Sequence, residues 1–346
     1  MSEEIINKLF SNKIKQFIFI YTPPKVGSTT LVSSLRISLS NLFNVIHIHD
    51  DIMLNVLTGI TNITVNEIIN YLSHQDNIIY VIDVYRTPIE RKMSEFFEKI
   101  SPYHFNNTEE NINKYSIKRV SDRFNKLFPH LAIGDHYFDK YNIEKPVVFD
   151  LKKKYTIQEI NNIKYIKLRL CDSKIWGLIL TEIFKKEIIL INDYQTNEKE
   201  ISELYKKFKK EYKIPLNFFE LIKNCNYLKF YFSEEERNQY LHKWSEIITD
   251  NFVPYTKEEY NFYVNLYLEN QYINDIQLEH YIDNGCLCNF CTKTRQEIFI
   301  RAKKGEKQFN KIIHQNEINK YINKKINDFK SISKNNKQNN RFKIKF

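Results

Sequence analysis

The sequence predicts an α/β fold: a three-layer sandwich whose central, mainly parallel sheet is flanked by helices, with a helical C-terminal extension. Two observations predict this class. Apolar runs of strand length occur at 17–21, 43–49 and 77–85, and each is followed by a segment whose apolar residues recur at helical spacing. Strands that alternate with helices build parallel sheets covered on both faces, and ligands then bind at the carboxyl ends of the strands.

The first strand leads into a loop that is rich in groups able to bind an anion. The apolar run stops at two prolines, and after the loop three leucines spaced four apart, Leu31, Leu35 and Leu39, predict a helix. The loop contains one cation, one glycine and three hydroxyl groups: Lys25, Gly27, Ser28, Thr29 and Thr30. Backbone amides at the positive end of a helix dipole, beside a lysine, predict an anion site.

The order of residues in this loop excludes a Walker A motif, because Lys25 precedes the glycine instead of following it. The order Pro-Lys-x-Gly-Ser-Thr-Thr resembles the 5′-phosphosulfate loop of sulfotransferases, whose sandwich is of the P-loop type. The resemblance implies that Lys25 contacts the phosphosulfate of the donor, 3′-phosphoadenylyl sulfate (PAPS), and that residues 27–30 surround it with amides and hydroxyls. The alternative is an ordinary strand-to-helix turn in which Gly27 supplies backbone freedom.

A second motif follows the strand expected at 77–85. Arg86-x-Pro88 comes directly after this strand, and Ser94 stands eight residues beyond Arg86. Pro88 suits the first turn of a helix, which puts Ser94 about two turns along it. The pattern resembles the 3′-phosphate motif of sulfotransferases and implies that Arg86 and Ser94 bind the 3′-phosphate of PAPS. A surface salt bridge and a solvated hydroxyl are the alternative.

Sulfuryl transfer to a hydroxyl requires a group that takes the hydroxyl proton. The second strand contains His47-Ile-His49 and is followed by Asp50 and Asp51. A His-x-His occurs between the two donor motifs in carbohydrate sulfotransferases of the uronyl 2-O type, where the second histidine is the base. The resemblance implies that His49 is the base. His47, Asp50 and Asp51 are the next candidates. Alternatively, a histidine at a strand end hydrogen-bonds a neighbouring loop.

Further elements are expected along the rest of the chain. They are a short helix over 1–15, helices over 64–73 and 116–128, adjacent strands over 146–151 and 164–170, a helix after Cys171 capped by Asp172 or Ser173, a strand over 187–192, charged helices over 198–212 and 233–248, and basic helices over 295–313 and 317–329. Thr64 and Glu67 stand at the positions of a capping box. The polar end from residue 330 predicts disorder.

Three weaker patterns bear on the acceptor. They are Arg169-Leu-x-Asp with Trp176 after it, Tyr-Lys-Lys-Phe-Lys from Tyr205, and Phe-Tyr-Phe-Ser-Glu-Glu-Glu from Phe230. Over residues 16–248 they resemble capsular-polysaccharide sulfotransferases. The resemblance implies a carbohydrate or glycan acceptor, while a protein tyrosine acceptor stays open.

Three of the five cysteines, Cys286, Cys288 and Cys291, stand within six residues. Together with His280 they would supply the four ligands of a structural zinc ion. The spacing C-x-C-x-x-C is not that of a standard zinc finger, so free buried or surface thiols are the alternative.

The net charge of +10 belongs to the C-terminal segment. Residues 293–346 contain sixteen Lys and Arg against four acids, so the preceding 292 residues carry a net charge of −2. A basic tail can hold an anionic polymer, a membrane surface or, nonspecifically, nucleic acid. The expected division is an α/β domain over 1–250, a helical, Cys-containing extension over 251–292 and a partly disordered basic tail over 293–346.

Neither a signal peptide nor a membrane anchor is expected. The first residues are acidic and then mixed, and no run of about eighteen apolar residues occurs in the sequence. The expected location is the cytoplasm.

These patterns predict a sulfotransferase that moves the sulfuryl group of PAPS to a hydroxyl of a polysaccharide or glycan and releases adenosine 3′,5′-bisphosphate (PAP). Two alternatives stay open. A P-loop nucleotide or small-molecule kinase would use the same strand-loop-helix with ATP and Mg²⁺. A non-enzymatic nucleic-acid-binding protein would act through the basic tail.

Overall fold

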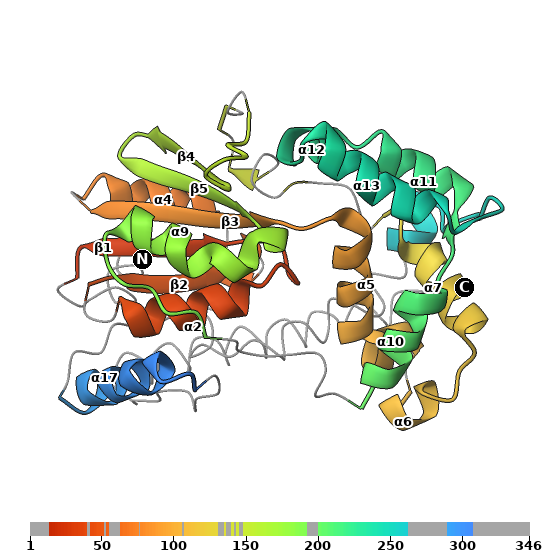
Figure 1. Ribbon diagram of the computed structural model, residues 1–346, viewed down its shortest axis with the longest axis horizontal. Coiled ribbons are helices and arrows are strands. Elements are labelled where there is room, and N and C mark those ends of the chain that lie inside the picture. Colours follow the sequence, from red (N-terminus) through yellow and green to blue (C-terminus); the bar gives the residue numbers. More distant parts are fainter. Residues whose placement is uncertain are drawn as a thin grey trace, which may run out of the picture.

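The computed structural model divides the chain into a sheet lobe and a helical lobe, as seen in Figure 1. It describes residues 14–39, 42–51, 53–54, 63–75, 77–105, 107–130, 135, 140–141, 143–144, 148–191, 200–261 and 289–306, without the side chains of 102, 103, 289–292 and 295. The sheet lobe carries the strands and their covering helices. The helical lobe begins where the central strand of the sheet ends.

The sheet confirms the α/β class and the mainly parallel arrangement. Its strands are β1 (Gln16–Tyr21), β2 (Asn44–Ile48), β3 (Ile78–Tyr85), β4 (Tyr155–Ile160) and β5 (Ile163–Arg169). Their order is β2-β1-β3-β5-β4, and only β4 runs antiparallel to its neighbour. The three strands expected from the first apolar runs therefore lie side by side at the centre and one edge of the sheet.

Helices cover both faces of this sheet, as the alternation of buried residues requires. Helix α4 (Val65–Ser73) packs against the face that contains Phe19 and Val81. Helices α2 (Ser28–Ser38) and α9 (Trp176–Phe184) cover the face that contains Ile20 and Ile82. Successive residues of a strand point to opposite faces, so β1, β2, β3 and β5 are buried along nearly their whole length, whereas the edge strand β4 has exposed residues at alternate positions.

The capping box expected at the start of α4 is present. The Thr64 hydroxyl accepts a hydrogen bond from the backbone amide of Glu67 at 3.2 Å, and the Glu67 carboxylate accepts one from the amide of Thr64 at 2.7 Å. Two amides of the first turn are thereby satisfied, and α4 begins where the sequence indicates.

The helical lobe packs around an aromatic core. Its elements are α5 (Pro88–Glu98), a π-helical turn η1 (Ile100–Phe105), α6 (Glu109–Ile112), α7 (Ile117–Leu127), α10 (Ser202–Glu211), α11 (Leu216–Lys223), α12 (Asn226–Tyr231), α13 (Glu234–Ser245) and the two-residue parallel strands β6 (Ile214–Pro215) and β7 (Ile248–Thr249). Phe96, Phe124 and Phe208 are buried at its centre. Tyr85, the last residue of β3, stacks on Tyr231 of α12 and so joins this core to the sheet.

Two expected strands are wrong. Residues 148–151 form no strand; instead Asp150 accepts hydrogen bonds from the amides of Lys152 and Lys153 and closes a turn. The neighbour of β5 is β4, further along the chain. Residues 187–191 are extended but lie outside the sheet, because the hydroxyls of Ser34 and Ser38 on α2 accept their amide hydrogen bonds.

The helix expected after Cys171 starts later than predicted and without the expected cap. A 3₁₀ turn, η2 (Leu170–Ile175), precedes α9, and the N-cap position is occupied by Ile175. Asp172 binds Arg169 instead of capping the helix. The capping expectation is therefore wrong.

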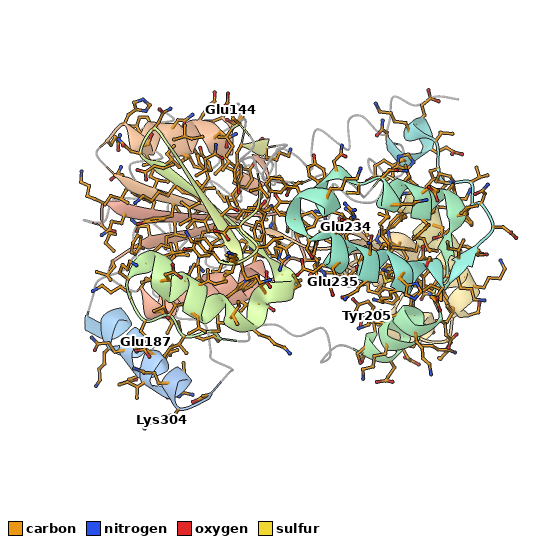
Figure 2. The ribbon with its side chains drawn as sticks, turned by 45° about the horizontal axis from the view of Figure 1, so that its top comes forward. Glu144, Glu187, Tyr205, Glu234, Glu235 and Lys304 are labelled. Carbon is orange, nitrogen blue, oxygen red and sulfur yellow. The ribbon has the colours of Figure 1, made fainter. Side chains whose placement is uncertain are left out.

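The first part of the basic segment is a helix docked on the sheet lobe. Helix α17 (Asn289–Lys303) packs through Ile298 and Ala302 on Ile37 of α2, and Lys303 binds Glu187 at 2.6 Å. Figure 2 shows α17 beside Glu187, and Tyr205 on the opposite, helical lobe. Residues 1–13 and 307–346, with their expected helices and disorder, lie outside the described residues.

Within the described ranges, no helix is long and apolar enough to cross a membrane.

Candidate functional site

The order of the strands defines one place where a ligand is expected. From β1 the chain crosses to β2 on one side and then to β3 on the other, so the direction of winding reverses between β1 and β3. In open α/β sheets the crevice at such a switch point, beyond the carboxyl ends of the strands, is the ligand site. The loop with Lys25 follows β1, and Arg86 follows β3. Both motifs therefore begin at the switch point.

The loop after β1 has a strained backbone. Lys25 has a φ of 66° and Gly27 a φ of 86°, both in the left-handed region. Only glycine enters this region without steric cost, so Lys25 is held there by its surroundings. Strain of this kind concentrates at binding and catalytic sites.

Gly27 is the N-cap residue of α2 and makes no side-chain cap. The amides of the first turn, from Ser28, Thr29 and Thr30, thus lack the capping oxygen that a serine or aspartate would supply. The Ser28 side chain is buried, and the side chains of Thr29 and Thr30 are half-buried. A helix start of this kind offers its amides and its positive dipole end to an anion.

Arg86 joins the two motifs directly. Its guanidinium Nη1 donates a 2.6 Å hydrogen bond to the carbonyl oxygen of Lys25, across 61 positions of sequence. Burial lowers the pKa of Arg86, and the nearby Tyr205 side chain and Glu90 raise it. The backbone of Lys25 is thereby fixed by the residue that opens the second motif.

Positive charge accumulates around Arg86. The ammonium of Lys209 lies 4.3 Å from the centre of the Tyr205 ring, next to Arg86. Burial lowers the pKa of Lys209, and the charges of Arg86, Lys206 and Lys243 lower it further. Like charges gathered at a partly buried position are the electrostatic complement of a phosphate dianion.

Glu98 contacts the lysine of the loop. The Lys25 ammonium lies 3.1 Å from the Glu98 carboxylate, in an ion pair that is mostly buried on both sides. Glu98 is the last residue of α5 and stands four residues after Ser94, whose side chain is also buried. Sequence reasoning did not find Glu98. The spacing of four was the available signal, because it puts both residues on one face of the helix.

His49 has the tautomer that a base needs. Its Nδ1 lies 2.7 Å from the carbonyl oxygen of Thr22, which can only accept, so Nδ1 carries the proton and Nε2 is the basic nitrogen of the neutral ring. Burial lowers the pKa of His49 and keeps the ring neutral at pH 7. His47 is 1 % exposed, and its ring meets that of His49 at 4.5 Å between centres. His47 therefore lies inside the lobe, behind His49.

The two aspartates after His49 have local structural contacts. Asp50 accepts a 2.8 Å hydrogen bond from the amide of Met53, and Asp51 accepts one of 2.8 Å from the amide of Val65, the first residue of α4. Each carboxylate satisfies an amide that a helix start leaves without a partner.

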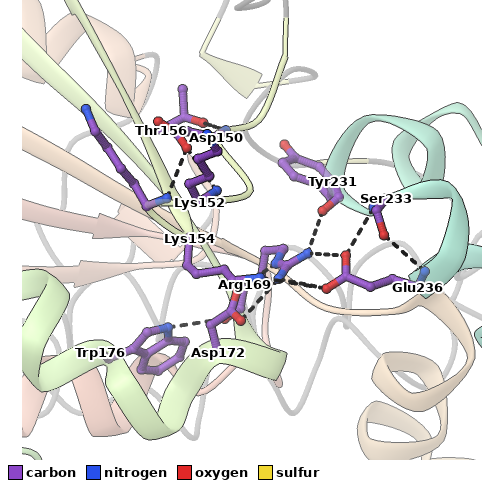
Figure 3. A network of polar contacts seen from close by, with 11 residues as sticks. Asp150, Lys152, Lys154, Thr156, Arg169, Asp172, Trp176, Tyr231, Ser233 and Glu236 are labelled. Atoms are coloured by element: carbon purple, nitrogen blue, oxygen red, sulfur yellow. Dashed lines mark hydrogen bonds and ion pairs between the residues drawn. The ribbon is translucent and has the colours of Figure 1, made fainter.

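Arg169, Asp172, Trp176 and Glu236 meet in one network at the junction of the lobes, drawn in Figure 3. The Arg169 guanidinium donates to both carboxylate oxygens of Asp172 and of Glu236, and to the carbonyl of Tyr231. The Trp176 indole donates to the carbonyl of Arg169 at 3.2 Å. Arg169 is buried, and it ties the end of β5 to α12 and α13.

A second buried cluster is centred on Lys167, two residues before Arg169 on β5. The Lys167 ammonium binds the carboxylates of Asp83 and Asp135, and the Tyr231 hydroxyl donates to Asp135. All four side chains are buried. One cation between two carboxylates leaves an excess of negative charge in a region of low dielectric constant, so the arrangement favours a proton on one of them.

The expected zinc ligands are not placed. His280, Cys286 and Cys288, and the side chain of Cys291, lie outside the described residues. Among the side chains that are described, no group of three or more His, Cys, Asp and Glu gathers as it would around a metal ion.

Comparison with known proteins finds no family model, no curated protein and no solved structure that matches this chain. The residues of the site therefore carry the functional inference.

Proposed function

We propose that the chain is a sulfotransferase that moves the sulfuryl group of PAPS to a hydroxyl of a carbohydrate acceptor, on a sandwich of the P-loop type. The observation that carries the proposal is the 2.6 Å hydrogen bond from Arg86 to the carbonyl of Lys25. It joins the two segments that resemble the donor motifs, at the switch point of the sheet where α/β proteins bind ligands.

The charges at this edge fit a donor that is anionic at both ends. Lys25 and the amides of the first turn of α2 are partners for a phosphosulfate. Arg86, with Lys209 beside it, is a partner for a 3′-phosphate. The buried hydroxyl of Thr22, directly after β1, has no hydrogen-bond partner among the described residues. It can donate a further hydrogen bond to an anion at the loop.

Each residue has one task in the proposed reaction, for which PAPS supplies the activated sulfuryl group. Lys25 and the α2 amides neutralise the charge that grows on the departing phosphate. Arg86 and Ser94 hold the 3′-phosphate and so fix the reacting end in position. Nε2 of His49 accepts the proton of the acceptor hydroxyl.

The carbohydrate acceptor is supported by the network of Figure 3. Arg169, Asp172, Trp176 and Glu236 come from the separate patterns that resemble polysaccharide sulfotransferases, and they contact one another through Arg169.

Calorimetric titration with PAP tests the donor site. Wild type is expected to bind PAP with a micromolar dissociation constant, and Arg86→Ala is expected to weaken binding about 10- to 100-fold, because a charge-assisted hydrogen bond contributes about 1.5–3 kcal/mol. Arg119→Ala is the matched control, since Arg119 lies over the Tyr115 ring in the helical lobe, away from Lys25. Its affinity should equal that of wild type.

Parallel titrations separate the alternatives. A preference for ATP with Mg²⁺ would favour a kinase, and binding to nucleic acid that is lost on deleting residues 293–346 would favour a binding protein. In a second assay, transfer of labelled sulfate from PAPS to a panel of polysaccharides should disappear in Lys25→Ala while the variant stays folded. Unchanged transfer would contradict the proposal.

A further inference from the structure

Lys25, in the loop that follows β1, is paired with the carboxylate of Glu98 from another part of the chain. Lys25 Nζ lies 3.1 Å from Oε1 of Glu98, and the two side chains are 13 % and 29 % exposed. A carboxylate oxygen is the same kind of partner for an ammonium group as a phosphate oxygen. The Glu98 carboxylate and an anion bound through Lys25 are drawn to the same ammonium and repel each other, so the carboxylate opposes binding of the anion.

Helix α5 contacts the loop at both of its ends. Arg86, just before α5, holds the carbonyl of Lys25, and Glu98, its last residue, holds the ammonium. Between these contacts Phe96 and Phe97 are buried in the core and fix the helix. These two contacts fix the position of the loop relative to α5.

The two contacts differ in how easily they can be released. Arg86 donates to the backbone carbonyl of Lys25 through Nη1 alone, and a guanidinium has five N–H donors, so a phosphate can bind Arg86 without breaking this bond. Glu98 stands at the end of its helix and keeps part of its side chain in solvent. Because the Glu98 side chain is 29 % exposed, its carboxylate can turn away from Lys25 toward solvent without unpacking the core.

We propose that Glu98 is a specificity-determining residue of the loop, which holds Lys25 until a ligand with more negative charge than one carboxylate displaces it. The ligand class is a phosphorylated or phosphosulfated nucleotide, and its identity as PAPS rests on the proposed function. An anion with a single charge gains no more binding free energy from Lys25 than the Glu98 carboxylate does. Such an anion therefore does not displace Glu98 from the loop. A nucleotide that also binds Arg86 gains enough to displace the carboxylate.

The test is calorimetric titration of PAP and of inorganic pyrophosphate into wild type, Glu98→Gln, Lys25→Ala and the double variant. Glutamine keeps the shape of the side chain and removes its charge. Glu98→Gln is expected to bind PAP about fivefold more tightly than wild type, since the ligand no longer competes with an ion pair. Glu110→Gln, which removes an exposed carboxylate paired with Lys114, should leave the affinity unchanged.

The double variant distinguishes direct competition from a general effect of charge. The gain in PAP affinity that Glu98→Gln causes should fall by at least half when Lys25 is alanine, because no ammonium remains for Glu98 to hold. A gain of equal size with and without Lys25, or no gain in Glu98→Gln, would overturn the proposal.

Pyrophosphate separates this inference from the proposed function. If Glu98→Gln binds pyrophosphate more tightly than wild type does, and in a Lys25-dependent manner, while no variant binds PAP, then Glu98 controls the loop and the sulfotransferase assignment fails. If neither probe binds Glu98→Gln, the loop is no anion site and both proposals fail.

Discussion

The indole of Trp176 lies directly against Gly27 at the start of α2. A β-carbon built on Gly27 would come within 3.1 Å of Cη2 of Trp176 and 3.0 Å of Cδ1 of Leu170. The indole is held in this position by its hydrogen bond to the carbonyl of Arg169. The loop after β1 is therefore packed against the network around Arg169 that joins the lobes.

Replacing Gly27 with alanine is expected to lower the free energy of unfolding by about 2–5 kcal/mol. The left-handed backbone costs about 1–2 kcal/mol for alanine, and crowding against fixed side chains in the core costs about 1–3 kcal/mol more. Urea denaturation measures the loss. Gly305→Ala is the control, because Gly305 has a φ of 93° but no neighbour within 4 Å of the added carbon. Equal losses in the two variants would show that contact with Trp176 adds nothing.

Arg169→Met is expected to destabilise the fold by about 3–5 kcal/mol, since it leaves Asp172 and Glu236 without the cation that they share. Arg169 is 1 % exposed. Denaturant unfolding gives the difference. The control Lys114→Met removes a cation from an exposed pair with Glu110 and should cost at most about 1 kcal/mol. A loss of similar size in both variants would mean that burial of Arg169 does not matter.

The sequence predicts the first half of the sheet well because the signals there are local. Three apolar runs become three buried neighbouring strands, and Pro88 and the Thr64 capping box mark helix starts that depend only on nearby residues. The edge strand β4 was missed for the opposite reason. It has exposed residues at alternate positions and so contains no apolar run. Val148, in the run chosen instead, is 65 % exposed.

The site could be predicted only as separate pieces. Sequence order places Lys25 and Arg86 each at a strand end, but their hydrogen bond depends on β1 and β3 being neighbours. The contacts of Trp176 with Gly27, and of Tyr205 with Arg86, join segments that are more than a hundred residues apart. No local pattern contains such contacts, because they arise from the packing of elements that are far apart in the sequence.

His49→Gln is expected to reduce sulfate transfer at least about 100-fold, since a general base contributes 10²–10⁴-fold. PAP affinity should stay within about twofold of wild type. Burial lowers the pKa of His49 from 6.5, so the imidazole is already neutral above that pH. Transfer in wild type should therefore fall only as the pH drops below about 6.5. Transfer of labelled sulfate from PAPS, followed as a function of pH, measures both effects.

His74→Gln is the control for this prediction, because His74 is an exposed histidine at the end of α4. It should transfer at the rate of wild type. If His49→Gln keeps its activity, or if the acidic limb of the wild-type profile lies above pH 6.5, another group is the base.

The cluster around Lys167 is expected to make the protein less stable as the pH rises. Burial, together with the charge of Asp135, raises the pKa of Asp83 to about 7 against the opposing effect of Lys167. The folded state therefore keeps a proton on Asp83 at pH values where the unfolded chain has lost it. Stability from this group is fully present below the usual pKa of aspartate and is lost as the pH rises through about 7.

Asp83→Asn removes this titration, so wild type should lose stability relative to the variant between pH 5 and 7, by at most about 1.4 kcal/mol per pH unit. Chemical denaturation of both proteins across this range measures the difference, which cancels the titration of all other groups. Asp122→Asn, on the exposed face of α7 and paired with Lys118, should show no such slope. A constant difference between wild type and Asp83→Asn would mean that Lys167 keeps both buried carboxylates ionised.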